Sequence, residues 1–236
     1  MDFNEMIRKY FNENDFEISD LQVEQFLKFY DFLIEKNKVM NLTGITEMED
    51  VIVKHFLDSV MVLKYADLSG KNIVDIGTGA GFPGIPLAIL CPDSKFLLLD
   101  SLNKRIKFID EAVELLGLSN VETIHGRSEE LARKSEYREK FDYCLSRAVA
   151  NLSVLLEYCI PFVKKDGQFI SYKSMEFDEE MESSISAQKK LGCKNVKNIT
   201  FSLVENYGRS FLIFKKLFNT SKKYPRNSGQ IKKSPL

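Results

Sequence analysis

The sequence predicts an α/β protein with a mostly parallel, seven-stranded sheet, helices on both faces and a terminal antiparallel hairpin. From about residue 72 to residue 173, short apolar runs alternate with longer amphipathic stretches, the order of right-handed βαβ units. The runs "NITFSLVEN" and "RSFLIFKKL" then flank Tyr207 and Gly208, which predicts two strands around a tight turn. With 44% apolar residues in 236, the chain has enough material for a large core.

The first 67 residues are predicted to form a helical extension. In residues 21–40, Phe26, Phe29, Tyr30 and Leu33 recur at the spacing of an amphipathic helix. A second helix is expected up to Tyr65, and "DLSGKN" then marks a loop. We therefore expect three parts, a helical extension over 1–67, a main domain over 68–218 and a basic tail over 219–236.

Five strands are expected in the parallel part of the sheet, at residues 72–77, 95–100, 121–125, 141–146 and 167–173. The stretches between them, "PGIPLAILC", "KRIKFIDEAVELLGL", "SEELARK" and "NLSVLLEYCIPFVKK", are each long enough to cross over as a helix. The carboxyl ends of parallel strands meet at one edge of a sheet, where ligands bind in such folds.

Composition excludes several classes of protein. No apolar run approaches the length of about 20 residues that a membrane span needs, and no signal peptide is evident. We therefore expect a cytoplasmic protein with no membrane partner. Four cysteines show no CxxC spacing and no histidine at ligand spacing. We interpret them as buried small residues, and expect no metal site.

The basic charge lies at one end of the chain. The net charge is −1, yet eight Lys or Arg and no acid follow Glu205, so residues 1–205 carry −9 (−1 minus 8). One interpretation is a solvated, partly disordered tail. The other is an arm for a polyanion, because lysine and arginine that neutralise phosphates release counterions.

The glycine-rich stretch "VDIGTGAGFPG" fits two cofactors. Counted from Gly79 it is the GxGxxG of a dinucleotide-binding oxidoreductase; counted from Gly77 it is GxGxG, with Asp75 two residues earlier. An acid at the end of the strand would repel a pyrophosphate, but suits the ammonium and sulfonium groups of S-adenosylmethionine. We therefore favour S-adenosylmethionine as the cofactor over a dinucleotide or a plain strand-to-helix turn.

Two later strand ends support a nucleoside ligand. Asp100 ends the second strand, where a carboxylate accepts hydrogen bonds from ribose hydroxyls, although this holds for either cofactor. Ser128 and Glu129 follow the third strand, where the adenine edge of the methyl donor is expected.

The acceptor chemistry is constrained by what the sequence lacks. Cytosine methylation needs a cysteine nucleophile, usually preceded by proline, whereas Cys144 follows Tyr143 inside a predicted strand and is interpreted as core. An acceptor with a free lone pair, such as guanine N7, needs no base, so positioning would supply most of the rate.

Six motifs carry a family resemblance. "NLTGI", "KHFLDS", "VDIGTGAGFPGIPLAI", "LLDSLNKRIKFI", "GRSEEL" and "SRAVANL" occur in this order. The chain resembles the bacterial glucose-inhibited division protein B family, the RsmG-type 16S ribosomal RNA methyltransferases, over roughly residues 20–220. The resemblance implies a class I, Rossmann-like methyltransferase that places a methyl group from S-adenosylmethionine on N7 of a guanine near the decoding site of the small ribosomal subunit.

The resemblance also implies site residues. With the acids and glycines above, the expected donor contacts are Asp75, Gly77, Gly79, Gly81, Phe82, Asp100, Ser128, Glu129 and Arg147. Positioning roles are expected for Arg147, His55 and Lys173, although Ser174 stands where the family usually has glycine after the lysine. The expected RNA contacts are Asn41, Thr43, Asp58, Ser59 and, in the tail, Lys222, Lys223 and Arg226. Residues 55, 58 and 59 share one helix face.

Two further alternatives stay open from the sequence. An enzyme of the same fold that acts on a small molecule or a protein would bind the donor without depending on the basic tail. A non-catalytic RNA-binding module that keeps a donor site as a sensor would bind RNA without turnover. We expect a monomer whose partners are 16S rRNA and the small ribosomal subunit.

Overall fold

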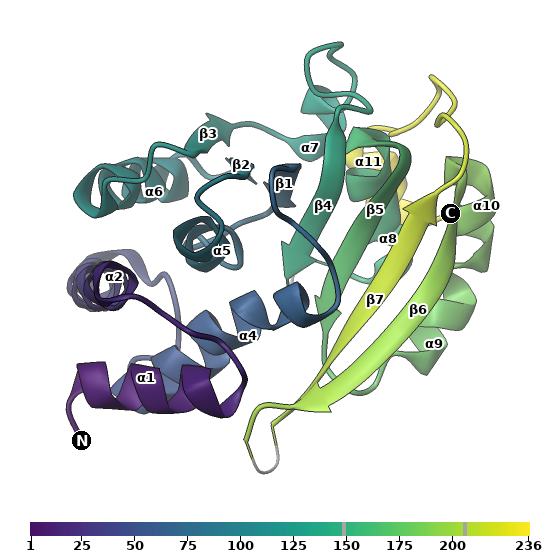
Figure 1. The fold of residues 1–236 in the computed structure, drawn as a ribbon. Coiled ribbons are helices and arrows are strands. Elements are labelled where there is room, and N and C mark those ends of the chain that lie inside the picture. Colours follow the sequence, from purple (N-terminus) through teal and green to yellow (C-terminus); the bar gives the residue numbers. More distant parts are fainter. Residues whose placement is uncertain (148–149, 205–206) are drawn as a thin grey trace.

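The structure is a computed structural model that describes residues 1–147, 150–204 and 207–236. Its centre is one seven-stranded sheet in the order β3-β2-β1-β4-β5-β7-β6 (Figure 1). The strands are β1 (Asn72–Ile76), β2 (Lys95–Asp100), β3 (Val121–His125), β4 (Phe141–Arg147), β5 (Val163–Lys173), β6 (Cys193–Ser202) and β7 (Gly208–Lys216). Strands β1 to β5 pair in parallel, and β7 lies antiparallel between β5 and β6. The predicted sheet and terminal hairpin are confirmed.

Two layers of helices cover the sheet. One face packs against α5 (Gly84–Leu90) and α6 (Asn103–Leu116), in a core that contains Ile73 and Leu98. The opposite face contributes Val74 and Leu97 to a second core with α8 (Leu152–Cys159) and α10 (Ile185–Leu191). Successive residues of one strand thus enter opposite cores, as the pleat requires. This is why the parallel strands are continuous apolar runs.

The amino-terminal helices belong to the first of these cores. Helix α1 (Phe3–Glu13) begins with a capping box of Asp2 and Glu5, and α2 (Asp20–Met40) begins with one of Ser19 and Gln22. As predicted, α2 buries Phe26, Phe29 and Leu33. The two helices share a continuous core with α5 and α6.

The next helical run changes its winding where the candidate site begins. Helix α3 (Met48–Val51) passes into a π-helical stretch (Ile52–Leu57), then α4 (Asp58–Val60) and a 3₁₀ turn (Met61–Lys64). The helix expected up to Tyr65 is confirmed, but residues 52–57 form a wider π turn that was not predicted. Such π turns often accompany functional sites. Here the turn lies beside His55 and Asp58, which are both buried.

Two helices between β5 and β6 were not predicted from the sequence. They are α9 (Asp178–Ser183) and α10. Helix α9 buries no side chain, so it has no apolar stripe for a sequence pattern to reveal. Helix α10 buries only Ala187 and Leu191.

The carboxyl-terminal segment is folded, so the interpretation of a partly disordered tail is wrong. Its short helix α11 (Ser228–Lys233) lies against α8, and Tyr224 and Ile231 are buried in the second core (Figure 1). The Arg138 guanidinium donates hydrogen bonds to the carbonyls of Thr220 and Tyr224, at 2.7 and 3.0 Å. These contacts fix the path of residues 219–236 over the domain.

The sequence also predicted that the four cysteines are buried and that the chain has no membrane span. Cys144, Cys159 and Cys193 are buried free thiols, as expected, whereas Cys91 is only half-buried. In the part of the chain that the structure describes, every helix is too short or too polar to cross a bilayer.

We predict that Gly84→Ala lowers the free energy of unfolding by about 1–3 kcal/mol, the usual cost of overpacking a core. A Cβ at this position would lie 2.2 Å from Leu98 Cδ2 and 3.1 Å from Asp75 Oδ2. Urea denaturation measures the change. Gly44→Ala is the control, because a Cβ at Gly44 meets nothing within 4 Å. Equal stability of the two variants would contradict the tight packing of the loop.

Candidate active site

The glycine loop connects β1 to α5 at the carboxyl edge of the sheet. Gly77 and Gly79 have φ values of +72° and +63°, which favour glycine. The amide groups of Gly77 and Thr78 both donate to the carbonyl of Leu99 in β2, at 2.9 and 3.1 Å. Gly81 closes the turn by donating to the carbonyl of Thr78 at 2.9 Å. The loop is therefore anchored to β2 while part of its backbone stays open to a ligand.

Asp75 lies beneath this loop. Its carboxylate is fully buried, and Oδ2 accepts a hydrogen bond from the Gly84 amide at 3.0 Å, whereas Oδ1 has no partner among the described residues. Burial raises the pKa of Asp75 to about 7. The side chain lines neither of the cavities described below. The structure thus places Asp75 at the base of the loop, where it holds the start of α5 through the Gly84 amide.

Two cavities meet at Gly77. The first, of about 340 Å³, lies at the ends of β1, β2 and β3, and its lining includes Ile76, Gly77, Leu99, Ser128, Glu129 and Val154. The second, of about 190 Å³, lies between the glycine loop and the helical extension, and its lining includes Thr43, His55, Gly77, Gly79, Phe82 and Arg147. Predicted donor and acceptor residues from distant parts of the sequence are thereby brought together.

The first cavity has the chemistry of a nucleoside site. Ile76, Leu99 and Val154 supply apolar surface, and Ser128 and Glu129 supply polar groups at the start of α7 (Ser128–Leu131). Both polar residues are only 8% exposed. Flat apolar walls with a few fixed polar groups suit a purine, whose exocyclic amino group is a donor for a carboxylate. The residues present therefore fit the adenosine end of S-adenosylmethionine.

Asp100, at the end of β2, is 2% exposed and lines neither cavity, although its hydrogen-bond partners Gly79 and Arg105 line the second. Its Oδ1 accepts from the Leu102 amide at 2.9 Å, and its Oδ2 accepts from the Gly79 amide at 3.0 Å and from Arg105 at 3.2 Å. Asp100 thus holds the glycine loop, and a ribose hydroxyl would share Oδ2 with Arg105.

In the second cavity, Phe82 packs against two polar side chains. Its ring stacks on the His55 imidazole with centroids 4.6 Å apart, and the Arg147 guanidinium lies 5.0 Å from the ring centroid. Phe82 is 5% exposed. It therefore presents little free surface for a stacked base.

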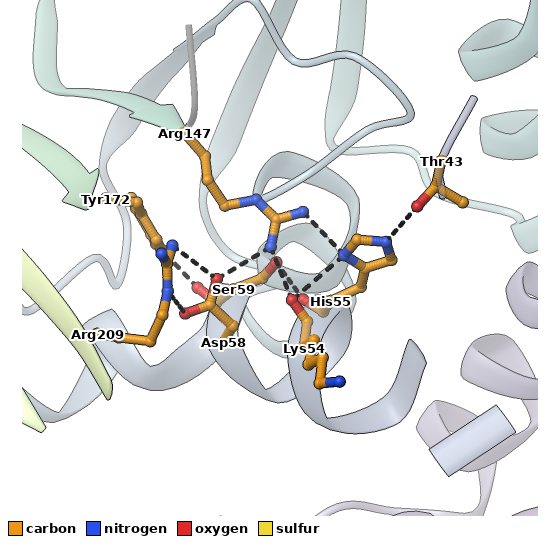
Figure 2. Close-up of polar contacts among 8 residues, drawn as sticks. All are labelled: Thr43, Lys54, His55, Asp58, Ser59, Arg147, Tyr172 and Arg209. Atoms are coloured by element: carbon orange, nitrogen blue, oxygen red, sulfur yellow. Dashed lines mark hydrogen bonds and ion pairs between the residues drawn. The ribbon is translucent and has the colours of Figure 1, made fainter. Parts of the chain in front are cut away.

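His55 is held as a neutral imidazole. Burial, with the nearby Arg147 charge, lowers the pKa of His55 to about 3. His55 Nδ1 lies 3.3 Å from Arg147 Nη2, a donor, and 3.2 Å from the carbonyl oxygen of Lys54, an acceptor (Figure 2). His55 Nε2 lies 2.7 Å from Thr43 Oγ1.

Asp58 joins two arginines from different strands. Its carboxylate is 1% exposed and accepts from Arg147, at the end of β4, at 3.0 Å. Arg209 in β7 also donates to it, with Nε at 2.8 Å and Nη2 at 3.1 Å (Figure 2). Burial alone would lower the pKa of Arg209, but the Asp58 carboxylate outweighs it and the pKa is raised. We call Asp58, Arg147 and Arg209 the arginine–aspartate cluster.

Of the expected RNA contacts in this region, the structure buries Asp58 and Ser59 and leaves Asn41 exposed. Asp58 is enclosed by the arginine–aspartate cluster, and Ser59 is fully buried, with its hydroxyl donating to the carbonyl of His55 at 2.5 Å. Asn41 is exposed and ends α2 in a left-handed conformation, outside both cavities. Of the four residues expected in this region, only Thr43 lines a cavity.

The side chains of Lys173 and Arg226 form ion pairs within the protein. Lys173 Nζ donates to Glu180 at 2.6 Å and to the carbonyl of Ala150 at 3.0 Å, and it lines neither cavity. The Arg226 guanidinium pairs with Glu157, with Nη2 2.7 Å from Oε2. By contrast, Lys222 and Lys223 are exposed.

Several residues that line or support the second cavity were not predicted from the sequence. The most important of these is Arg209, which binds Asp58. In the sequence it is a single arginine after a predicted turn, with no motif around it. Arg105 and Leu42 line the second cavity. Asn37 shapes the loop before Thr43, because its Oδ1 accepts from the amides of Leu42 and Thr43 at 2.6 and 2.9 Å. Within the described ranges, no group of three or more His, Cys, Asp or Glu side chains is arranged to hold a metal ion.

Comparison with known proteins identifies the family. Residues 22–212 match the family profile GidB, described as rRNA small subunit methyltransferase G. The chain belongs to this family. A ribosomal RNA small subunit methyltransferase G from Lachnoclostridium phytofermentans is 52% identical over 91% of this chain and 90% of that protein. Proteins of the same name from Desulforamulus reducens and Clostridium kluyveri are 46% and 44% identical, over 95% and 100% of this chain and 94% and 100% of theirs.

Solved structures that share the fold include a protein in complex with AdoMet and a SAM-dependent methyltransferase. TYW2 from M. jannaschii in complex with AdoMet superposes with a TM-score of 0.55 at 16% identity, over 69% of this chain and 76% of that chain. A SAM-dependent methyltransferase from Aquifex aeolicus superposes with a TM-score of 0.53 at 18% identity, over 70% of this chain and 92% of that chain. At these identities the likeness concerns the fold, which is the predicted Rossmann-like methyltransferase fold.

We predict that Asp75→Asn changes how stability depends on pH. The pKa of Asp75 is about 7 in the folded chain and 3.8 in the unfolded one, so wild type loses stability as pH rises from about 4 to 7. The variant cannot ionise. Its stability relative to wild type should therefore rise by at least about 1 kcal/mol between pH 5 and pH 7.5, because one pKa unit is about 1.4 kcal/mol.

Urea denaturation across this pH range measures the difference. The opposite trend of His55, whose pKa falls from 6.5 to about 3 on folding, is present in both proteins and cancels. Asp93→Asn, at an exposed acid, controls for the change in net charge and should give a flat difference. A flat difference for Asp75→Asn as well would contradict a protonated, buried carboxyl.

Proposed function

We propose that this protein transfers the methyl group of S-adenosylmethionine to N7 of a guanine in 16S rRNA of the small ribosomal subunit. The observation that carries the proposal is the second cavity, which we call the acceptor cavity: it meets the first cavity at Gly77 and is lined by His55 and Arg147. The His55 imidazole, with a pKa of about 3, is neutral at physiological pH. A ring nitrogen with a free lone pair is an acceptor that needs no proton removed.

The two cavities would hold the two ends of the donor. Ser128 and Glu129 in the first cavity face the adenosine, with Asp100 toward the ribose. The backbone of Gly77 and Gly79, which borders the second cavity, faces the methionine end. When bound, S-adenosylmethionine supplies a methyl group to the N7 lone pair as the carbon–sulfur bond breaks and its electron pair stays on sulfur. The rate then depends mainly on positioning.

The second cavity suits an acceptor that becomes positively charged. A protonated histidine there would oppose the charge developing on the methylated guanine, and the lowered pKa of His55 avoids this. Arg147 stays charged, and Asp58, 3.0 Å from it, offsets only part of that charge, because the same carboxylate also pairs with Arg209. We assign Arg147 to binding the donor carboxylate or guanine O6, and Thr43, His55 and Phe82 to shaping the acceptor cavity.

The remaining assignments concern the residues that bind the RNA outside the two cavities and the helical extension. Lys222 and Lys223 are exposed next to a folded carboxyl-terminal segment, and they would contact RNA phosphates with a salt-dependent affinity. The helical extension over residues 1–67 supplies the outer side of the acceptor cavity through Thr43 and His55. We further propose a cytoplasmic monomer that acts on the small subunit.

The proposal predicts methyl transfer from labelled S-adenosylmethionine to small ribosomal subunits that lack the modification. Strand scission at N7-methylguanine should then locate the label at a single guanine. Subunits that already carry the modification are the control and should accept no label. Label at a base nitrogen other than N7, or donor binding without label in RNA, would contradict the proposal and favour a small-molecule substrate or a sensor.

A further inference from the structure

The carboxyl-terminal helix α11 reaches the first cavity, which no sequence motif anticipated. Ser228 and Lys232 of α11 line this cavity together with Ser128 and Glu129. The family profile ends at residue 212, so α11 lies outside the matched region. Helix α11 packs against α8.

The segment that carries α11 is held firmly in place. Glu157 of α8 is fully buried and accepts from Arg226 through its backbone amide at 2.7 Å and through Nε at 2.9 Å. Ile231 is fully buried. The hydroxyls of Tyr158 and Ser228 lie 3.3 Å apart, which ties the start of α11 to α8. The face that α11 turns toward the cavity is therefore fixed by buried contacts.

The polar groups around the first cavity complement one another. Glu129 offers a carboxylate, which accepts hydrogen bonds, and Lys232 offers an ammonium group, which donates them. Adenine carries both kinds of partner, an exocyclic amino donor and ring-nitrogen acceptors. Arg127 also lines the cavity and lies 3.8 Å from Glu129, whereas Lys232 forms no ion pair among the described residues. A cavity with apolar walls, the Glu129 carboxylate and the Lys232 ammonium group therefore matches an adenine base on two edges.

We propose that α11 forms the outer wall of the adenosine pocket and that Lys232 binds the adenosine moiety of the methyl donor. The proposal rests on the proposed function, because it takes S-adenosylmethionine as the ligand. It gives Lys232 a role in donor binding, distinct from the phosphate contacts assigned to Lys222 and Lys223.

The test compares Lys232→Met with Lys233→Met. Both lysines are exposed neighbours on α11, but only Lys232 lines the cavity. Calorimetry would measure the Kd of S-adenosylmethionine and of 5′-methylthioadenosine, which lacks the amino-acid end. Loss of one hydrogen bond typically costs about 1 kcal/mol. Lys232→Met should therefore raise both Kd values about five-fold, and Lys233→Met should leave both within two-fold of wild type.

Binding to a fragment of small-subunit RNA separates the alternatives. The two variants should lose equal, small amounts of RNA affinity, since each removes one charge. Equal donor affinity in the two variants would overturn the proposal, and would assign α11 to RNA if both weakened RNA binding markedly. If the wild-type protein bound neither adenosine ligand, the proposed function itself would fail, a result distinct from failure of the α11 proposal.

Discussion

The buried carboxylate of Asp58 is the constraint on which the acceptor cavity depends. Arg147, Tyr172 and Arg209 come from β4, β5 and β7 and converge on the helical run over residues 48–60 (Figure 2). The two arginines bind Asp58, and the Tyr172 hydroxyl donates to the carbonyl of Ser59 at 2.8 Å. A buried charge is tolerated only when it is paired and hydrogen-bonded. Asp58 therefore fixes both where the helical extension lies and where Arg147 points.

The arginine–aspartate cluster connects this geometry to chemistry. With Arg147 fixed, its charge lies beside His55 and, with burial, keeps the imidazole neutral. The glycine loop then separates a nucleoside-like cavity from an acceptor cavity, and Gly77 borders both. The chain's own groups thus bind and orient. They offer little for proton transfer, which agrees with methylation of a ring nitrogen.

The sequence predicted most of the fold because its strands are buried on both faces and its crossovers are long. It failed for α9, which has no apolar stripe, and for the carboxyl-terminal segment, whose few buried residues, such as Tyr224 and Ile231, are scattered among charges. Where a motif fixes the backbone, as at Gly77 and Ser128, the predicted site residues line a cavity. Sequence analysis missed the ion pair whose two partners are far apart in the chain, since Arg209 and Asp58 are separated by 151 residues. No local pattern reveals that pairing or the burial of Asp58.

The most direct test of this account is the free energy of unfolding of Asp58→Asn, measured by urea denaturation. The substitution leaves two mostly buried arginines without their counter-charge, so we expect a loss of about 3–5 kcal/mol. Asp50→Asn is the matched control, since Asp50 pairs with Lys54 at the surface with 44% of its side chain exposed, and should cost no more than about 1 kcal/mol. Equal, small losses in the two variants would show that Asp58 does not hold the acceptor cavity together.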